Sequence, residues 1–179
     1  MPTFEPDFEN VKATTRIFGK GEYELDLKTI IGFVQYKKDE PETITYGVTI
    51  FPKMVGKVDS RGQLTEEFAG EDVEPIKLWM HNDGSLKGTK RFLMAVAGFD
   101  KKEEKEFNEW YKSQDFSVSA DEADDGSFEN VVIGEGWKSV AGKHIRANMD
   151  SRLYEPEGGE SREQQNFKGW IIPQQKASV

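Results

Sequence analysis

The feature that most constrains the fold is a long run of alternating side chains near the start of the chain. From Gly21 onward, apolar residues at every second position alternate with charged ones, and the run continues to Tyr36. A period of two places every second side chain on the same face of a β-strand. The sequence therefore predicts a half-buried strand over 21–36, with Gly32 as the point where it bulges or bends.

Four further segments have the composition of strands, and two have the spacing of helices. Residues 43–51 are β-branched and alternating, and the other three main candidates are 76–81, 137–149 and 166–172; a minor strand is also predicted at 131–133. Helices are predicted over 86–97 and 100–111, because Ser85 is a suitable N-cap and Asp100 with Glu103 resembles a capping box. Residues 52–75 are ambiguous, with a hairpin around 60–62 as one interpretation. Residues 117–126 are predicted to form a solvated acidic loop.

This order of elements predicts the fold class. Five strands with helical material between the third and fourth are typical of a mainly β (α+β) protein with a five-stranded OB-fold barrel. An open α+β sheet is the alternative. We expect an irregular lead-in over 1–19, a single OB-like domain over 20–173 with an acidic insert at about 100–130, and a short polar tail over 174–179.

Composition excludes several kinds of site. The chain of 179 residues has no cysteine, which excludes disulfides, thiolate metal sites and cysteine nucleophiles. No apolar run approaches the roughly 20 residues that span a bilayer, and the first residues do not resemble a signal peptide. We therefore expect a soluble, cytoplasmic protein without membrane contact.

Catalytic motifs are also missing from the sequence. The two histidines, His81 and His144, have no metal-ligand or general-base spacing, and no nucleophile elbow or phosphate-binding glycine loop is present. We expect no catalytic residues, no metal site and no cofactor. Catalysis is therefore the weakest functional hypothesis for this chain.

The charge is concentrated in one block. The formal net charge is -9, and residues 100–130 alone hold eleven acidic and four basic residues. The rest of the chain is nearly balanced, so a local basic surface remains compatible with the low isoelectric point. The block is explained by solubility or by binding of a protein partner. Mimicry of DNA by carboxylates is disfavoured by the lysine-bearing strand faces.

Aromatic and cationic residues share several predicted strand faces. Lys77, Trp79 and His81 alternate along one face of the third strand, a composition unlike a core, and Tyr46 is the expected companion of Trp79 on the second strand. Aromatic rings beside cations suit unstacked nucleic-acid bases and their phosphates. Further candidate phosphate partners include Lys37, Lys38 and Lys53.

Two Gly/Trp/Lys-rich patches supply the remaining candidates. The first holds Trp137, Lys138 and Lys143 and leads into a face formed by His144, Arg146 and Asn148; the second holds Trp170. The alternative for each tryptophan is a place in the hydrophobic core, and for the polar face a solvated strand surface. The candidate nucleic-acid-binding residues are Tyr46, Lys77, Trp79, His81, Trp137, Lys138, Lys143, His144, Arg146 and Trp170.

These motifs together resemble a known family. Gly21-x-Tyr23, Ile76-Lys-Leu-Trp79, Gly134-x-Gly-Trp137 and the closing Asn166–Pro173 segment resemble bacteriophage single-stranded DNA-binding proteins with an OB fold. The resemblance spans about residues 20–173 and implies non-catalytic, largely sequence-independent binding of single-stranded DNA in replication, recombination or repair. RNA is an alternative ligand. Many such proteins end in an acidic tail that recruits replication partners, whereas this chain ends without a carboxylate side chain.

The missing acidic tail leaves the acidic segment 100–130 as the candidate contact for replication or recombination proteins. The alternative function is a phage protein-interaction module that binds a host or replisome protein through this acidic helix and loop. Neither hypothesis determines the oligomeric state.

Overall fold

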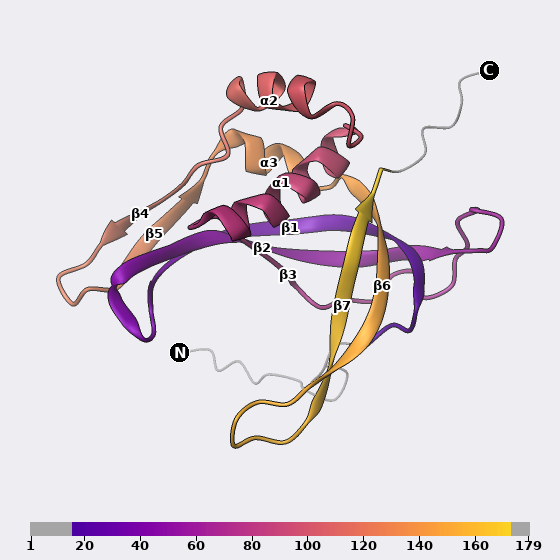
Figure 1. The fold of residues 1–179 in the computed structure, drawn as a ribbon, viewed down its shortest axis with the longest axis horizontal. Helices are drawn as coiled ribbons and strands as arrows, with labels where there is room; N and C mark the ends of the chain where they lie inside the picture. The colour runs from indigo at the N-terminus through magenta and orange to yellow at the C-terminus, as the bar shows by residue number, and fades with distance from the viewer. Residues whose placement is uncertain (1–15, 173–179) are drawn as a thin grey trace, which may run out of the picture.

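The computed structural model describes residues 16–172, and within them the chain is mainly β with helices on one side (Figure 1). Most of the predicted lead-in 1–19, and the tail 174–179, lie outside the described residues. The strands are β1 (Gly21–Lys37), β2 (Glu40–Val58), β3 (Ile76–Trp79), β4 (Val118–Glu122), β5 (Phe128–Ile133), β6 (His144–Tyr154) and β7 (Arg162–Ile171). The helices are α1 (Asp83–Ala97), α2 (Glu104–Lys112) and α3 (Glu135–Val140).

The main sheet has five antiparallel strands in the order β3-β2-β1-β6-β7, and β4 with β5 forms a separate two-stranded sheet. The predicted mainly β class with five principal strands is confirmed. The sheet is not closed into a barrel, since no pairing joins β3 to β7 within residues 16–172. β3 has only four residues, all of them paired to β2, and β7 forms the opposite edge beside β6.

Strand β1 is the centre of this sheet, and only its first part has a partner on both sides. Its first part, Gly21–Asp26, pairs with β6, while β2 follows it along most of its length. The register shifts near Asp26 and stays regular through Gly32, so the bulge predicted at Gly32 is wrong. Gly32 serves another purpose. An added Cβ would lie 2.8 Å from Ile133, so the missing side chain lets the β4–β5 hairpin pack on the sheet.

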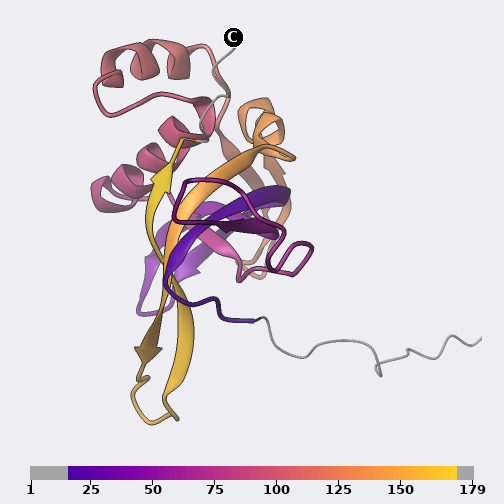
Figure 2. The ribbon, with the colours of Figure 1, turned by 90° about the vertical axis from the view of Figure 1, so that its right-hand side faces the viewer.

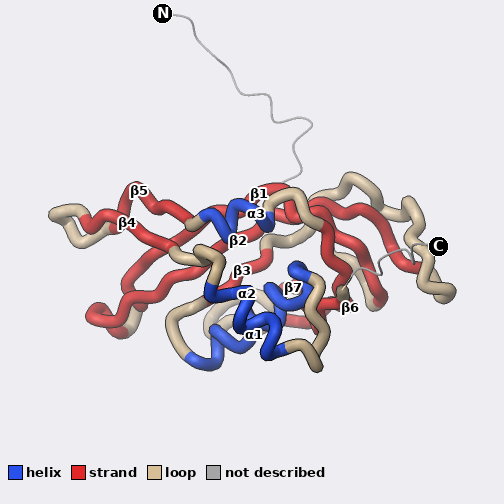
Figure 3. The backbone as a smooth tube through the Cα atoms, turned by 90° about the horizontal axis from the view of Figure 1, so that it is seen from above, coloured by secondary structure: helices blue, strands red, loops and turns tan. Residues whose placement is uncertain are grey.

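The hydrophobic core lies between the sheet and the helices, which cover one face of it (Figure 3). α1 starts with a capping box between Asn82 and Ser85, so Ser85 is the third helical residue rather than the cap itself. Gly98 ends α1 with a left-handed φ of 84°, as the sequence predicted. None of the helices within residues 16–172 is long and apolar enough to cross a membrane.

Two stretches of the predicted secondary structure are wrong. Residues 117–126, expected to be a loop, contain β4 and form a hairpin with β5. Residues 137–143, expected to begin the fourth main strand, belong to α3 and a turn, and the strand starts at His144. The uncertain stretch 52–75 extends β2 to Val58 and then turns, where the Asp59 carboxylate accepts hydrogen bonds from two backbone N–H groups at Arg61 and Gln63.

Candidate nucleic-acid interface

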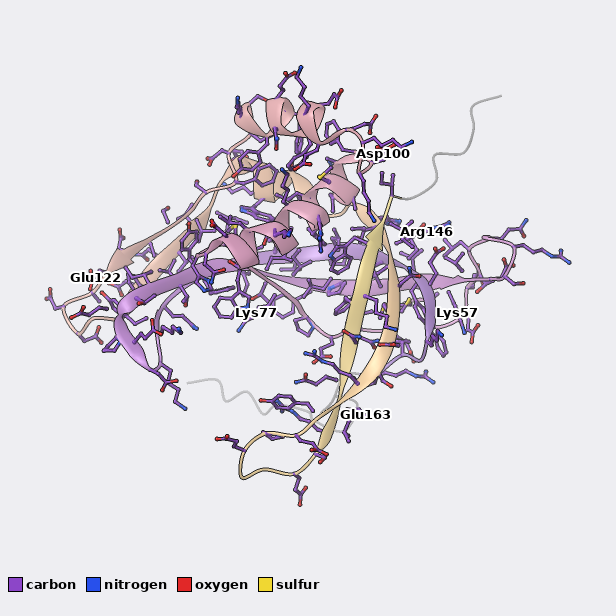
Figure 4. All side chains as sticks on the ribbon, viewed as in Figure 1. Lys57, Lys77, Asp100, Glu122, Arg146 and Glu163 are labelled. Carbon is purple, nitrogen blue, oxygen red and sulfur yellow. The ribbon has the colours of Figure 1, made fainter. Side chains whose placement is uncertain are left out.

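The register of β1, β2 and β3 determines which side chains share a face. Gly47 of β2 lies opposite Phe33 and Trp79, and Thr49 lies opposite Ile31 and Lys77. Directly paired residues project to the same side of a sheet. The neighbouring residues Val48 and Leu78 project to the other side and are buried in the core. We call the side that carries Phe33, Trp79 and Lys77 the outer face; Figure 4 shows Lys77 on it, away from the helices.

An aromatic and cationic cluster stands on this outer face. The rings of Phe33 and Trp79 meet edge to face with centroids 4.7 Å apart, and the His81 ring lies 5.6 Å from that of Trp79. The Lys77 Nζ is 5.3 Å from both the Phe33 and the Trp79 centroid. We call these four residues the Trp79 cluster. It holds a cation against two aromatic rings at the distance of a cation–π contact.

Gly47 makes the cluster geometrically feasible. An added Cβ at this position would overlap the carbonyl oxygen of Leu78 and would lie 2.9 Å from Cζ of Phe33. Because glycine has no side chain, the Phe33 ring extends over β2 to reach Trp79 on the next strand. The glycine within this strand therefore marks a close approach across the sheet.

A shallow cleft of about 320 Å³ adjoins the cluster. It is lined by Gln35, Lys37, Lys38, Thr45, Trp79, His81 and Ser85. The lining includes two lysines and no carboxylate. Lys37 Nζ is 2.6 Å from a Glu40 oxygen, whereas Lys38 and Lys77 form no ion pair with any residue between 16 and 172. The local charge is therefore positive, in contrast to the charge of the whole chain.

The acidic β4–β5 hairpin lies away from the outer face and its cleft. It packs at Gly32 on the side of the sheet that bears the core, and Figure 1 shows it beyond one end of the helical layer. Tyr36 anchors it through a tilted ring contact with Phe128, with centroids 5.0 Å apart, and by donating a hydrogen bond to Glu122. That hydrogen bond is the main reason why the pKa of Tyr36 is raised above its usual value. Sheet geometry thus separates the acidic hairpin from the lysines of the cleft.

Two predicted aromatic candidates lie on the wrong side for this site. Tyr46 is next to Gly47 along β2 and so projects to the face opposite Trp79. Trp170 stacks on Phe167 (5.4 Å) and meets Phe92 edge-on (5.0 Å), against the core. These two candidates therefore do not share the outer face with Trp79.

Trp137 is a core residue. It lies on α3, its side chain is fully buried, and its indole Nε1 donates a hydrogen bond of 2.8 Å to the Phe116 carbonyl. The preceding glycines serve the same contact, because an added Cβ at Gly134 or Gly136 would collide with Asp115. A buried indole cannot stack on a base, so the first Gly/Trp patch joins α3 to residues 115–117. Lys138 is exposed on α3 and pairs with Glu135 at 2.8 Å.

The polar face of β6 has the predicted alternation, with His144, Arg146 and Asn148 opposite buried Ile145, Ala147 and Met149. Its cationic groups already have partners. Arg146 Nε is 3.1 Å from Glu24 Oε1, and its Nη1 is 3.7 Å from Glu22 Oε2 and donates to the Gly62 carbonyl.

The imidazole of His144 is similarly placed between two carboxylates. Its Nδ1 lies 3.2 Å from Glu24 Oε2 and its Nε2 lies 3.7 Å from Asp26 Oδ2. A phosphate at His144 or Arg146 would have to displace these carboxylates, so this polar face is a weaker candidate than the Trp79 cluster. Lys143 is exposed in the turn before β6, remote in the register from the Trp79 cluster.

Of the ten predicted residues, the structure therefore brings together Lys77, Trp79 and His81. Sequence reasoning missed Phe33 and the cleft residues Gln35, Thr45 and Ser85. A signal was present, because Gly47 interrupts a β-branched strand that runs beside the alternating Ile31-x-Phe33-x-Gln35.

No group of three or more histidine or carboxylate side chains within residues 16–172 is arranged to hold a metal ion. No protein-family model and no curated protein matches the sequence.

Proposed function

We propose that this protein binds single-stranded DNA, without catalysis and largely without sequence preference, on the outer face of β1, β2 and β3. The observation that carries this proposal is Lys77 Nζ at 5.3 Å from both Phe33 and Trp79, beside a cleft with two further lysines and no carboxylate. Stacking on an aromatic ring accepts any base, and lysines track the backbone phosphates. The expected outcome is binding that tolerates sequence and depends strongly on salt.

The arrangement of strands supports an OB-like interpretation of the fold. The order β3-β2-β1-β6-β7, with α1, α2, the β4–β5 hairpin and α3 between the third and fourth strands of this sheet, supports a comparison with a partly open OB barrel. In that fold the second and third strands, and the loop between the first two, bind oligonucleotides. Trp79 on β3, with Lys37 and Lys38 at the β1–β2 turn, occupies the equivalent places.

This interpretation extends to the biological role. We propose membership of the phage-type single-stranded DNA-binding class named above, acting in replication, recombination or repair. The β6–β7 hairpin projects past the sheet on the side away from the helices (Figure 2), as a flanking arm would. Its tip carries Tyr154, 40 % exposed, with the Arg162 guanidinium 5.3 Å from the ring centroid.

Tryptophan fluorescence gives a site-specific test. Of the four tryptophans, Trp137 is buried and Trp110 and Trp170 pack against the core, so only Trp79 stands on the outer face. Titration with oligo-dT should quench the emission. Trp79→Phe should remove most of the quenching while retaining much of the affinity, because a phenyl ring still stacks. Trp79→Ala should weaken binding by about 1–3 kcal/mol.

Salt and a matched lysine control make the test specific. Lys77→Ala should lower the affinity for oligo-dT. It should also reduce the slope of log K against log salt concentration by about 0.7, the contribution of one phosphate contact on a single strand. Lys105→Ala, an exposed lysine on α2 in the helical layer, should change neither. Duplex DNA and oligo-rU serve as comparison ligands. Absence of oligo-dT binding by the wild-type chain at low salt would contradict the function.

A second candidate function rests on the β4–β5 hairpin. Residues 113–134 contain six carboxylates and no lysine or arginine, and the hairpin exposes 54 % of Val132. We propose as the alternative that this acidic, partly apolar hairpin contacts a basic protein of the replication machinery. A nuclease-resistant pull-down that is lost in the Asp124→Lys, Glu129→Lys double variant would support it. Loss of the pull-down on nuclease treatment would contradict it.

A further inference from the structure

A second cleft opens on the outer face, farther along β2. Its volume is about 420 Å³, and its lining residues are Lys28, Thr29, Phe51, Pro52, Lys53, Asp72, Val73 and Pro75. Phe51 is 40 % exposed, which is unusual for a large aromatic side chain on a central strand. The face that bears the Trp79 cluster therefore carries another accessible ring beside two more lysines, of which Lys28 pairs with Asp26 at 3.0 Å and Lys53 pairs with Asp72.

The two clefts are connected by one continuous strip of the sheet. Phe51 pairs with Thr29, the next row in the same direction is Ile31–Thr49–Lys77, and the row after that is Phe33–Gly47–Trp79. Lys77 thus lies between the two aromatic positions. Phe51 lies four positions after Gly47 on β2, a distance of roughly 13 Å along the strand.

The strip between the clefts is accessible and carries an apolar residue beside Lys77. Ile31 stands in the middle row and is 50 % exposed. The exposed Ile31 side chain gives the sugars and base edges of a bound strand an apolar surface between the two aromatic positions.

We propose that the Phe51 cleft is a second base-stacking subsite for the same single strand, which passes from the Trp79 cluster over Lys77 to Phe51. This inference rests on the proposed function and specifies the length and path of its site. An unstacked base would lie on the Phe51 ring, and the adjoining phosphate would meet Lys53.

Asp72 is an internal competitor for that phosphate. Lys53 Nζ lies 2.7 Å from Asp72 Oδ1, with the lysine side chain 45 % and the aspartate side chain 72 % exposed. An exposed ion pair contributes little net stability, so an incoming phosphate displaces the carboxylate at small cost. Removal of the Asp72 charge should therefore strengthen binding at this subsite.

The experiment compares a four-nucleotide with a ten-nucleotide oligo-dT at low salt. Phe51→Ala should weaken the longer ligand about fivefold or more and change the shorter ligand, which the Trp79 cluster accommodates, by less than about twofold. Asp72→Asn should tighten only the longer ligand. Tyr46→Ala is the matched control, because Tyr46 is an aromatic residue of the same strand, 37 % exposed, on the opposite face.

The possible outcomes separate the two proposals. If Phe51→Ala behaves like Tyr46→Ala at both lengths while Trp79→Ala weakens both ligands, the second subsite is wrong and the function stands. If the wild-type chain binds neither ligand, the function fails and the subsite fails with it. If Phe51→Ala does not fold, Asp72→Asn decides: an unchanged affinity for the longer ligand overturns the subsite.

Discussion

Trp79 and Trp137 have similar neighbours in the sequence but occupy opposite environments. Lys77 precedes Trp79 by two positions, and Lys138 directly follows Trp137. Trp79 is partly exposed on the outer face of β3, with Lys77 beside its ring. Trp137 is fully buried on α3 and donates its indole hydrogen to Phe116. A tryptophan–lysine pair in the sequence therefore does not identify a binding surface. A binding surface is identified by the face of the fold on which the tryptophan lies.

The largest expected effect separates the two tryptophans by stability. Trp137→Ala removes the largest fully buried side chain and leaves the Phe116 carbonyl without its donor, so the free energy of unfolding should fall by about 3–5 kcal/mol. Trp79→Ala should lower it by no more than about 1.5 kcal/mol, the value of an aromatic pair. Urea denaturation followed by circular dichroism measures both. Equal losses would refute the assignment of Trp79 to an exposed site.

Gly47→Ala tests how the fold creates the exposed site. The added methyl would collide with the Leu78 carbonyl and the Phe33 ring, so we expect a loss of about 1–3 kcal/mol in stability together with weaker oligo-dT binding. Gly169→Ala is the control, because an added Cβ at Gly169 meets nothing within 4 Å. Its effect should stay within about 0.5 kcal/mol. An unperturbed Gly47→Ala variant would contradict the close packing of Phe33 across β2.

Arg146→Ala distinguishes a structural cation from a binding one. Its side chain is 13 % exposed and is held by Glu22 and Glu24, so its removal should cost about 1–2 kcal/mol of stability by leaving the half-buried carboxylates unpaired. Oligo-dT affinity, measured by fluorescence titration on the folded variant, should stay within about twofold of wild type. A loss as large as that of Lys77→Ala would move the binding surface to β6.

The smallest effect concerns acid stability near Trp137. Hydrogen bonds from Ser117 hold the pKa of Asp115 below its ordinary value, with a further contribution from Lys138. Since the folded-state pKa is lowered, this stabilisation is complete above the ordinary carboxyl pKa of about 4 and is lost as the pH falls through the folded value. Asp115→Asn should flatten the fall of the urea midpoint as the pH is lowered below the ordinary carboxyl pKa of about 4. An unchanged profile would contradict this coupling.

Much of the fold could be predicted from local patterns. The alternation from Gly21 determined β1, and Gly98 determined the end of α1, because both signals depend on neighbours in the chain. The start of the predicted fourth strand failed for a different reason. Gly134-Glu-Gly-Trp has no strong local preference, and α3 forms there because Trp137 fills the core and the glycines allow Asp115 to approach.

The candidate site shows the same division. The alternation in the sequence was enough to predict that Lys77 and Trp79 share one side of β3, because strand geometry imposes a period of two. The folded sheet places Phe33 beside them, turns Tyr46 to the opposite face and pairs Arg146 with Glu24. These are contacts between strands, and their register is set by pairing across the sheet, which a single sequence does not encode locally.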